Sequence, residues 1–321
     1  MEVHRKHMSI NDYVHRQCAV VSIAVFFVLG VAQPAPAQLG LGLVPMRVEL
    51  KMSPGQQLSG ALKLSSESGA KTRIRAEVDD FYIDATDTPQ FERDIPQETA
   101  TSCKKWLSLN PMEIELDKGG FLLVRYTFRL PADVAEGSYN CAAGFTTLRP
   151  ATETAAEGMG MHMAVRIVTA FYIQVGSPPV VGRLKEIKLE ALPPAPPEEP
   201  GSAAVPVSPD APVAKDAKPG WQAVVVLENS GKMHFRPTGR LEALDAEGKA
   251  VETADFPSLA ILRERSQRVI FPLKTHLDPG HYTLRVNVDI GAGEIQQGTA
   301  DVVVEAAASP TPPPIPAPAP K

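Results

Sequence analysis

The sequence predicts an all-β protein made of two immunoglobulin-like β-sandwich domains. Short segments with alternating apolar and polar residues recur between Val44 and Val304, and a period of two is typical of strands. Turn-forming residues such as Pro54-Gly55 and Gly119-Gly120 separate these segments. No stretch shows a convincing helical period. Many short strands with turns between them are typical of an antiparallel sandwich.

Length and charge limit the possible classes of protein. The chain has 321 residues, which suits about two domains with linkers, and 44% hydrophobic residues are enough for ordinary cores. Its formal net charge is −5. Sequence-independent binding of nucleic acid needs a basic face. We therefore expect no nucleic-acid partner.

The N-terminus has the three parts of a secretory signal peptide. Arg5, Lys6 and Arg16 form a basic region, 19–32 is apolar, and Ala35-Pro36-Ala37 fits a small-x-small cleavage site. We expect residues 1–37 to be removed after Ala37 and the mature chain to be periplasmic. An uncleaved anchor is the alternative, although the apolar run is short for a span of about 20 residues. No second run of spanning length follows, so no membrane insertion of the mature chain is expected.

Two cysteines remain after removal of the signal peptide, which carries Cys18. Cys103 and Cys141 are an even pair in an exported protein, and a structural disulfide is the natural interpretation. Two unpaired buried thiols are the alternative. The pair lacks the Cys-x-x-Cys spacing of a redox site.

The first domain is expected over residues 38–177. Residues 38–43 are a flexible lead-in, and 84–101 form a polar excursion between strands. The alternating segments predict strands at 44–51, 58–64, 72–83, 106–109, 112–116, 121–130, 138–148 and 161–175.

The long strand Met161–Val175 closes this domain and follows a small, polar loop. Met161, Met163, Val165 and Ile167 lie on one parity of the strand, and both faces are partly apolar. Burial on two sides or a face awaiting a partner both produce this pattern. The four residues therefore form either a partner-binding strand or part of an ordinary core strand.

A second, smaller domain is expected over 178–305. Its segment 193–220 and the tail 306–321 are rich in proline and alanine, and both are predicted to be disordered. Alternating segments predict strands at 181–192, 221–228, 239–244, 267–273, 282–288 and 299–304.

No group of residues predicts catalysis, a cofactor or a metal. Asp79, Asp80, Asp84 and Asp87 lack the spacing of a calcium loop, and a solvated acidic turn explains them better. The histidines are scattered, without the spacing of a zinc site: His162, His234, His276 and His281. Since no phosphate-binding glycine loop or Gly-x-Ser-x-Gly motif occurs either, we expect the protein not to be an enzyme.

Several blocks resemble a known family. Ala170-Phe171-Tyr172 follows a flexible loop on a long alternating strand. Together with 106–111, Gly119-Gly120, 129–133 and 137–139, this block is similar to the periplasmic pilus-assembly chaperones of the PapD type. The resemblance covers the first domain from about Val44 to Val175 and the second domain in outline.

The resemblance implies a binding mechanism. In that family the long strand completes the fold of a pilus subunit by β-strand addition, and a basic pair in the inter-domain cleft anchors the subunit's C-terminal carboxylate. Arg47 occupies the position of the family's cleft arginine, although a surface arginine is the alternative. Thr169 occupies the position of the cleft lysine, so Arg166 is the remaining candidate for the second charge.

These observations predict a periplasmic chaperone-like protein that holds an exported β-rich subunit, such as a pilus subunit, by strand addition. A structural or adhesive envelope protein with immunoglobulin-like domains is the alternative.

Overall fold

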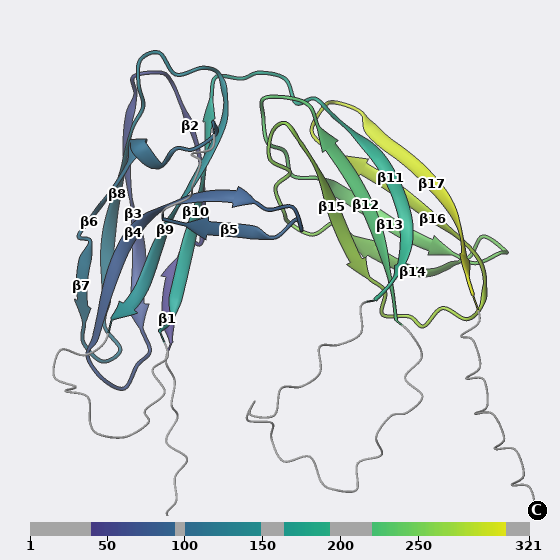
Figure 1. The fold of residues 1–321 in the computed structure, drawn as a ribbon, viewed down its shortest axis with the longest axis horizontal. Coiled ribbons are helices and arrows are strands. Elements are labelled where there is room, and N and C mark those ends of the chain that lie inside the picture. Colours follow the sequence, from purple (N-terminus) through teal and green to yellow (C-terminus); the bar gives the residue numbers. More distant parts are fainter. Residues whose placement is uncertain (1–39, 94–99, 149–163, 193–219, 306–321) are drawn as a thin grey trace, which may run out of the picture.

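The computed structural model describes residues 40–93, 100–148, 164–192 and 220–305. These residues form two β-sandwiches, seen side by side in Figure 1. The predicted all-β fold class is confirmed. The predicted signal peptide 1–37, all but Gly220 of the predicted insertion 193–220, and the tail 306–321 lie outside the described residues, so the predictions made for them stay predictions.

The first sandwich packs a four-stranded sheet, in the order β1-β3-β8-β6, on a sheet with the order β2-β10-β9-β4-β5, in which β7 also pairs with β4. A single 3-10 turn, η1, spans Lys104–Trp106. The strands of the first sandwich are β1 Leu41–Val44, β2 Arg47–Met52, β3 Gln57–Ser66, β4 Thr72–Ile83, β5 Pro89–Glu92, β6 Leu107–Asn110, β7 Glu113–Leu116, β8 Phe121–Arg129, β9 Gly137–Leu148 and β10 Arg166–Val175.

Aromatic residues from both sheets fill the core of the first sandwich. The ring of Phe171 on β10 lies 5.1 Å from the rings of both Tyr126 and Phe128 on β8. Phe128 and Phe171 are fully buried. Edge-to-face contacts of this kind add to the stabilisation from area burial, so they fix β10 against the opposite sheet.

The second sandwich has a three-stranded sheet, β11-β12-β15, and a four-stranded sheet, β14-β13-β16-β17. Its core includes Leu227, Leu241 and Leu284, all fully buried. Its strands are β11 Gly182–Ala191, β12 Trp221–Asn229, β13 Thr238–Leu244, β14 Ala250–Asp255, β15 Arg265–Pro272, β16 Gly280–Asp289 and β17 Ile295–Val304.

Three strands differ from the prediction. Leu41–Val44 is a strand, β1, rather than a flexible lead-in, because it pairs with β3. Part of the expected polar excursion forms β5, which pairs with the end of β4. β14 was not predicted, and it pairs with β13. All three have six residues or fewer, and their sequences LGLV, PQFE and AVETAD do not alternate clearly between apolar and polar residues.

Cys103 and Cys141 form the predicted disulfide. Both residues are fully buried in the first core. The bond ties the segment before η1 to β9, where Cys103 N also donates to Asn140 O at 3.3 Å. The crosslink therefore holds an otherwise irregular connection on the sheet.

We expect the double variant Cys103→Ala/Cys141→Ala to lower the free energy of unfolding of the first sandwich by about 2–4 kcal/mol, because the crosslink restricts the unfolded chain. Urea unfolding followed by circular dichroism measures the loss. The second sandwich contains no cysteine among its described residues and serves as an internal control. An unchanged midpoint for the first sandwich would contradict a stabilising role.

Candidate binding site between the two sandwiches

An apolar cluster joins the two sandwiches. Phe81 on β4, Ala142 on β9 and Tyr172 on β10 pack against Ala260 and Leu262 of the second sandwich. Phe81 also packs on Tyr172, with ring centroids 5.5 Å apart. The outward face of β10 is thus an internal surface between the sandwiches, which explains why both faces of this strand are apolar.

Polar contacts surround this cluster. Ser138 N donates to Lys232 O at 2.8 Å, and His234 N donates to the Ser138 hydroxyl at 2.8 Å. Arg265 forms an ion pair of 2.5 Å with Asp87 and donates to Ile83 O at 2.8 Å. These contacts fix the two sandwiches relative to each other.

Two arginines from different sandwiches share one carboxylate beside the cluster. Arg236 Nε lies 2.7 Å from Glu49 Oε1, and Arg47 Nε lies 3.5 Å from the same oxygen. Arg47 also donates to the Ser258 hydroxyl at 3.1 Å. With one carboxylate for two guanidinium groups, this arginine pair keeps a net positive charge.

Glu49 is the acidic member of this group. Burial acts to raise its pKa, but the hydrogen bond from Arg236 and the nearby positive charges hold the pKa below its usual value. Glu49 is therefore ionised at neutral pH. A further anion at the site has to compete with it or use the remaining donors.

Arg236 retains a donor for such an anion. Its guanidinium lies over the ring of Tyr172, 4.8 Å from the centroid, in the geometry of a cation–π contact. Its Nη2 is buried and has no hydrogen-bond partner among the described residues. Arg47, Tyr172 and Arg236 line a cavity of about 230 Å³ with Phe81 and Ser258. A buried unpaired donor beside a cavity suits an oxygen ligand.

Arg166, the other predicted anchor, lies elsewhere. Its Nη2 is 2.6 Å from Asp79 Oδ2, and its Nη1 donates to Phe91 O at 2.9 Å. Asp79 is fully buried. Burial raises the pKa of Asp79, and Arg166 opposes that shift. In the structure, Arg166 thus compensates a buried carboxylate and does not lie beside Arg47.

β10 is paired on both sides for only part of its length. β9 pairs with it from Arg166 to Val175, whereas β2 runs parallel to it only from Ala170, opposite Arg47. Before that point the chain turns away at Pro45, and β1 pairs with β3 in the other sheet. The side of Arg166–Thr169 away from β9 has no strand partner among the described residues.

Ile167, one of the four residues predicted to bind a partner, lies on β10 with its side chain on the inner face of the strand. Ile167 is half-buried and packs against the first core. Val165 precedes β10 and is bonded to Thr147 through its backbone, with Thr147 N to Val165 O at 2.9 Å. Met161 and Met163 lie outside the described residues. Ile167 is therefore placed as a core residue, the alternative left open by the sequence.

The predicted absence of a metal site was argued from spacing, and the structure gives each carboxylate another partner. Asp80 forms an ion pair with Lys104 at 3.2 Å, and Asp87 pairs with Arg265. Asp84 accepts from Thr86, Thr88 and Gln90 in an exposed turn, and these bonds lower its pKa to about 2. Among the described residues no group of three acidic, His or Cys side chains suits a metal ion.

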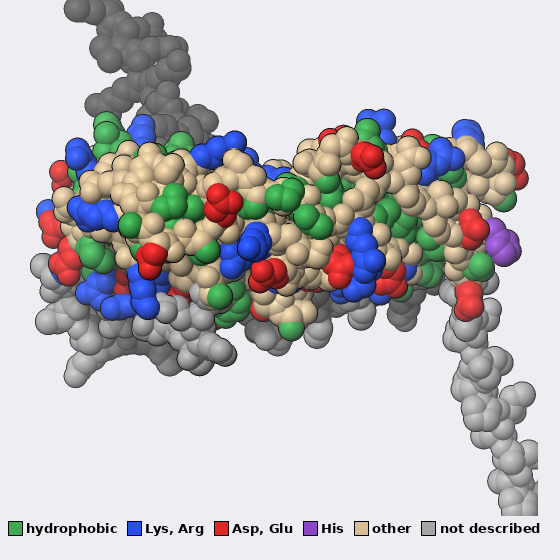
Figure 2. Space-filling model, turned by 90° about the horizontal axis from the view of Figure 1, so that it is seen from above, with side chains coloured by type: hydrophobic (Ala, Val, Ile, Leu, Met, Phe, Trp, Pro, Cys, Tyr) green, Lys and Arg blue, Asp and Glu red, His purple; other side chains and the backbone are tan. Residues whose placement is uncertain are grey.

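Figure 2 views the two sandwiches from above. On the face that it shows, acidic and basic side chains are interspersed and form no continuous basic surface. Within the described ranges no helix is long and apolar enough to cross a membrane.

We expect Arg166→Ala to lower the free energy of unfolding by about 2–4 kcal/mol, because it leaves the buried Asp79 carboxylate unpaired. Arg73→Ala is the matched control, since the Arg73–Glu115 pair is exposed and is worth about 0.5 kcal/mol or less. Adding Asp79→Asn to Arg166→Ala should recover part of the loss. Equal effects of Arg166→Ala and Arg73→Ala in urea unfolding would contradict this assignment.

We expect His234 to make the contact between the sandwiches less stable in acid. Burial and the charge of Arg236 lower its pKa, with Glu49 opposing; its ring lies 5.1 Å from Tyr172. Between the lowered folded pKa and the unfolded value near 6.5, the unfolded chain binds the extra proton. Stability is therefore lost as pH falls below about 6.5.

The measurement is urea unfolding of the wild type and of His234→Gln between pH 7.5 and 5. The wild type should lose more stability than the variant, at no more than about 1.4 kcal/mol per pH unit for one proton. Parallel pH profiles of the two proteins would show that His234 does not titrate in this window.

Comparison with known proteins finds similar chains in solved structures of fimbrial chaperones and their complexes. No family model and none of the curated proteins compared matches the chain. Solved structures similar to it include a chain of the chaperone–tip adhesin complex of CFA/I fimbriae (11% identity, TM-score 0.41, 83% of this chain and 100% of that one). The class 5 fimbriae chaperone CfaA is also similar, with 10% identity, a TM-score of 0.40 and coverage of 84% of this chain and 100% of that one. The Pseudomonas aeruginosa chaperone CupB2 has 11% identity, a TM-score of 0.37 and coverage of 82% of this chain and 100% of that one. At these values the likeness carries no weight for function. The chain is thus similar to these three structures at about one-tenth sequence identity.

Proposed function

We propose that this chain is a periplasmic chaperone-like protein that holds an exported β-rich subunit, such as a pilus subunit, by β-strand addition. The observation that carries the proposal is that the unpaired part of the β10 edge ends at the arginine pair Arg47 and Arg236. Binding, rather than catalysis, is the activity that this arrangement suits. Export depends on cleavage after Ala37, as the N-terminal sequence predicts.

The free backbone groups of β10 suit an added strand. Ala170 N donates to Met46 O at 3.0 Å, on the β2 side of the strand. Backbone direction alternates along a strand, so the N–H and C=O groups of Arg166 and Val168 point to the same side. Unpaired groups of this kind are a template for another chain.

The end of such a strand meets the arginine pair. β2 runs parallel to β10 and begins at Arg47, opposite Ala170. A guest strand that runs in the same direction along Arg166–Thr169 is in line with β2, so its C-terminus arrives at Arg47. A terminal carboxylate there can accept hydrogen bonds from Arg47 and from the unpaired Nη2 of Arg236.

The roles of the residues follow from their positions. Arg47 marks the end of the added strand, because β2 blocks the edge beyond it. Arg236 supplies a second charge from the other sandwich, and Glu49 and Tyr172 orient its guanidinium. Met161, Met163 and Val165 remain part of the binding strand predicted from the sequence, and Ile167 supports β10 from the core.

We expect Arg47→Ala and Arg236→Ala each to weaken binding of a C-terminal carboxylate by about 10–100-fold, the usual effect of losing a charge-assisted hydrogen bond. The probe is a fluorescent peptide of alternating apolar residues with a free C-terminus, measured by fluorescence anisotropy. The same peptide with an amidated C-terminus should bind the wild type as weakly as the free acid binds the variants.

Arg240→Ala is the matched control, because Arg240 is an exposed arginine of the second sandwich paired only with Asp255 in the hydrogen bonds and ion pairs described. It should leave peptide binding unchanged. Equal affinity of the wild type for the free and amidated peptides would overturn the anchoring role. In that case co-purification from native cells without any β-rich partner would favour the structural or adhesive alternative.

A further inference from the structure

The second sandwich has one edge strand without the usual protection against pairing. Within the described ranges, β17 ends its sheet and pairs with β16 alone. Edge strands are normally short or carry charges, prolines or bulges. β17 has ten residues, none of them proline or basic, with Asp301 as its one charge. Its register with β16 is continuous from Ile295 to Val304.

The other edges of this sandwich are protected. β14 has only six residues, two of them acidic. β15 contains Arg265 and Arg268 and ends at Pro272. β11 has a bulge between Leu184 and Glu186. Half of the residues of β11 are charged: Arg183, Lys185, Glu186, Lys188 and Glu190.

The outward face of β17 exposes two large apolar side chains. Ile295 is 64% exposed and Val303 is 57% exposed. Their partners on β16 are Asp289 and His281, so no apolar neighbour on that strand covers them. The two residues lie near opposite ends of the strand, at equal distances from Thr299.

This spacing is self-complementary. If a second copy of β17 lies antiparallel with the two Thr299 residues opposite each other, Ile295 faces the second copy's Val303. In the same register Gln297 faces the second copy's Asp301, to which its amide can donate. Apolar, hydroxyl and amide–carboxylate pairs are all favourable across strands, and this face brings no two like charges into direct opposition.

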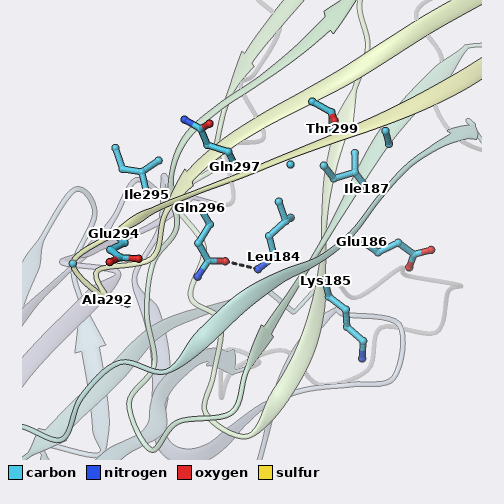
Figure 3. Close-up of a pocket in the computed structure, with 13 residues that line it drawn as sticks. Leu184, Lys185, Glu186, Ile187, Ala292, Glu294, Ile295, Gln296, Gln297 and Thr299 are labelled. Carbon is cyan, nitrogen blue, oxygen red and sulfur yellow. Dashed lines mark hydrogen bonds between the residues drawn. The ribbon is translucent and has the colours of Figure 1, made fainter.

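The inner face of β17 has room beside it. A groove of about 920 Å³ lies between β11 and β17, shown in Figure 3. Gln296 bridges it, with Leu184 N donating to its Oε1 at 2.6 Å and its Nε2 donating to Gly182 O at 2.9 Å. In the register above, the second copy's Val302 and Ala300 lie beside Gln296 and Gly298, at this groove. Both are small enough to enter it.

We propose that two copies of this chain pair through β17, which joins their four-stranded sheets into one sheet of eight strands. The contact is isologous, so it closes at a dimer. β17 lies on the side of the second sandwich away from the first (Figure 1), and pairing therefore leaves the site at Arg47 and Arg236 open. A single strand pair buries less than the roughly 1,600 Å² of a typical stable interface, so we expect a weak dimer, with a Kd on the order of 10 μM.

The register is tested by cysteine crosslinking. Cys103 and Cys141 are bonded to each other, and Cys18→Ser is introduced into every variant. Thr299→Cys places two thiols opposite each other, with Cβ atoms about 5 Å apart, close enough for a disulfide after a small adjustment. Gln297→Cys is the matched control, because its two copies lie about 13 Å apart in this register. Thr299→Cys should form a covalent dimer at least about 10-fold faster under mild oxidation.

Charge variants test the same contact in solution. Sedimentation velocity of the purified full-length gene product over a range of concentrations should show a monomer–dimer equilibrium. Ile295→Lys/Val303→Lys places lysine opposite lysine and should leave a monomer. Ile295→Glu/Val303→Lys places opposite charges together and should restore the dimer at low salt.

The proposal is overturned if the wild type is a monomer at all concentrations. It is also overturned if both cysteine variants crosslink at the same rate, or if both charge variants associate like the wild type. Crosslinking of Thr299→Cys to a different protein would assign the edge to another partner and would likewise overturn the dimer. None of these readouts depends on peptide binding at the arginine pair, so the two proposals fail independently.

Discussion

The parallel pairing of β2 with β10 is the constraint on which the rest of the first sandwich depends. β10 is held by β9 along its whole length but by β2 only from Ala170 onward. Pro45 has no N–H to give to a ladder, and the chain passes there into the opposite sheet as β1. This change of sheet at Pro45 leaves Arg166–Thr169 of β10 without a partner on the side away from β9, and it lets β1 extend the opposite sheet. It also places Arg47 where the paired part of that side of β10 begins.

The contact between the sandwiches brings a second arginine, Arg236, close to Arg47 at this boundary. The outer face of β10 is covered by Ala260 and Leu262, which brings Arg236 to within 2.7 Å of Glu49. Glu49 balances one arginine and leaves the second charge available. The same packing removes water from Tyr172 and His234, so a charge at this position is screened less than it would be on an open surface. The free edge of β10 sets the direction in which a guest strand runs. The second sandwich contributes Arg236, one of the two arginines that would bind the guest's C-terminus.

Much of the fold was predictable, because long strands carry enough periods to be distinctive. β4, β8 and β9 were all expected near their observed limits. The short strands β1, β5 and β14 were missed, because their residues do not alternate clearly between apolar and polar. The disulfide was predictable from the even pair of cysteines in a chain whose N-terminus predicts export.

The site was only half predictable. Arg47 was named because its position resembles that of the cleft arginine in the PapD-type chaperones. Arg236 was not, since it lies 187 residues from Glu49 in the sequence and no local spacing marks it. Arg166 was named because Thr169, at the position of the family's cleft lysine, carries no charge. It shares the outer face of β10 with Ala170, which lies opposite Arg47, but it is four residues earlier on the strand, and the buried Asp79 carboxylate holds its guanidinium. Its partner, Asp79, comes from β4 and was not identifiable from spacing. Parity separates the faces of a strand, but only packing shows which face is the core.

The two unpaired edges select partners in different ways. At β10 the free edge is short, so backbone hydrogen bonds alone give little discrimination, and the arginine pair adds recognition of a chain end. At β17 the edge is ten residues long and carries no basic residue. Selection there depends on register, because Ile295 and Val303 are covered together only when Thr299 lies on the two-fold axis. A one-residue slip moves every side chain of the guest strand to the opposite face. The first edge thus suits a chain with a free C-terminus, and the second suits a strand of its own sequence.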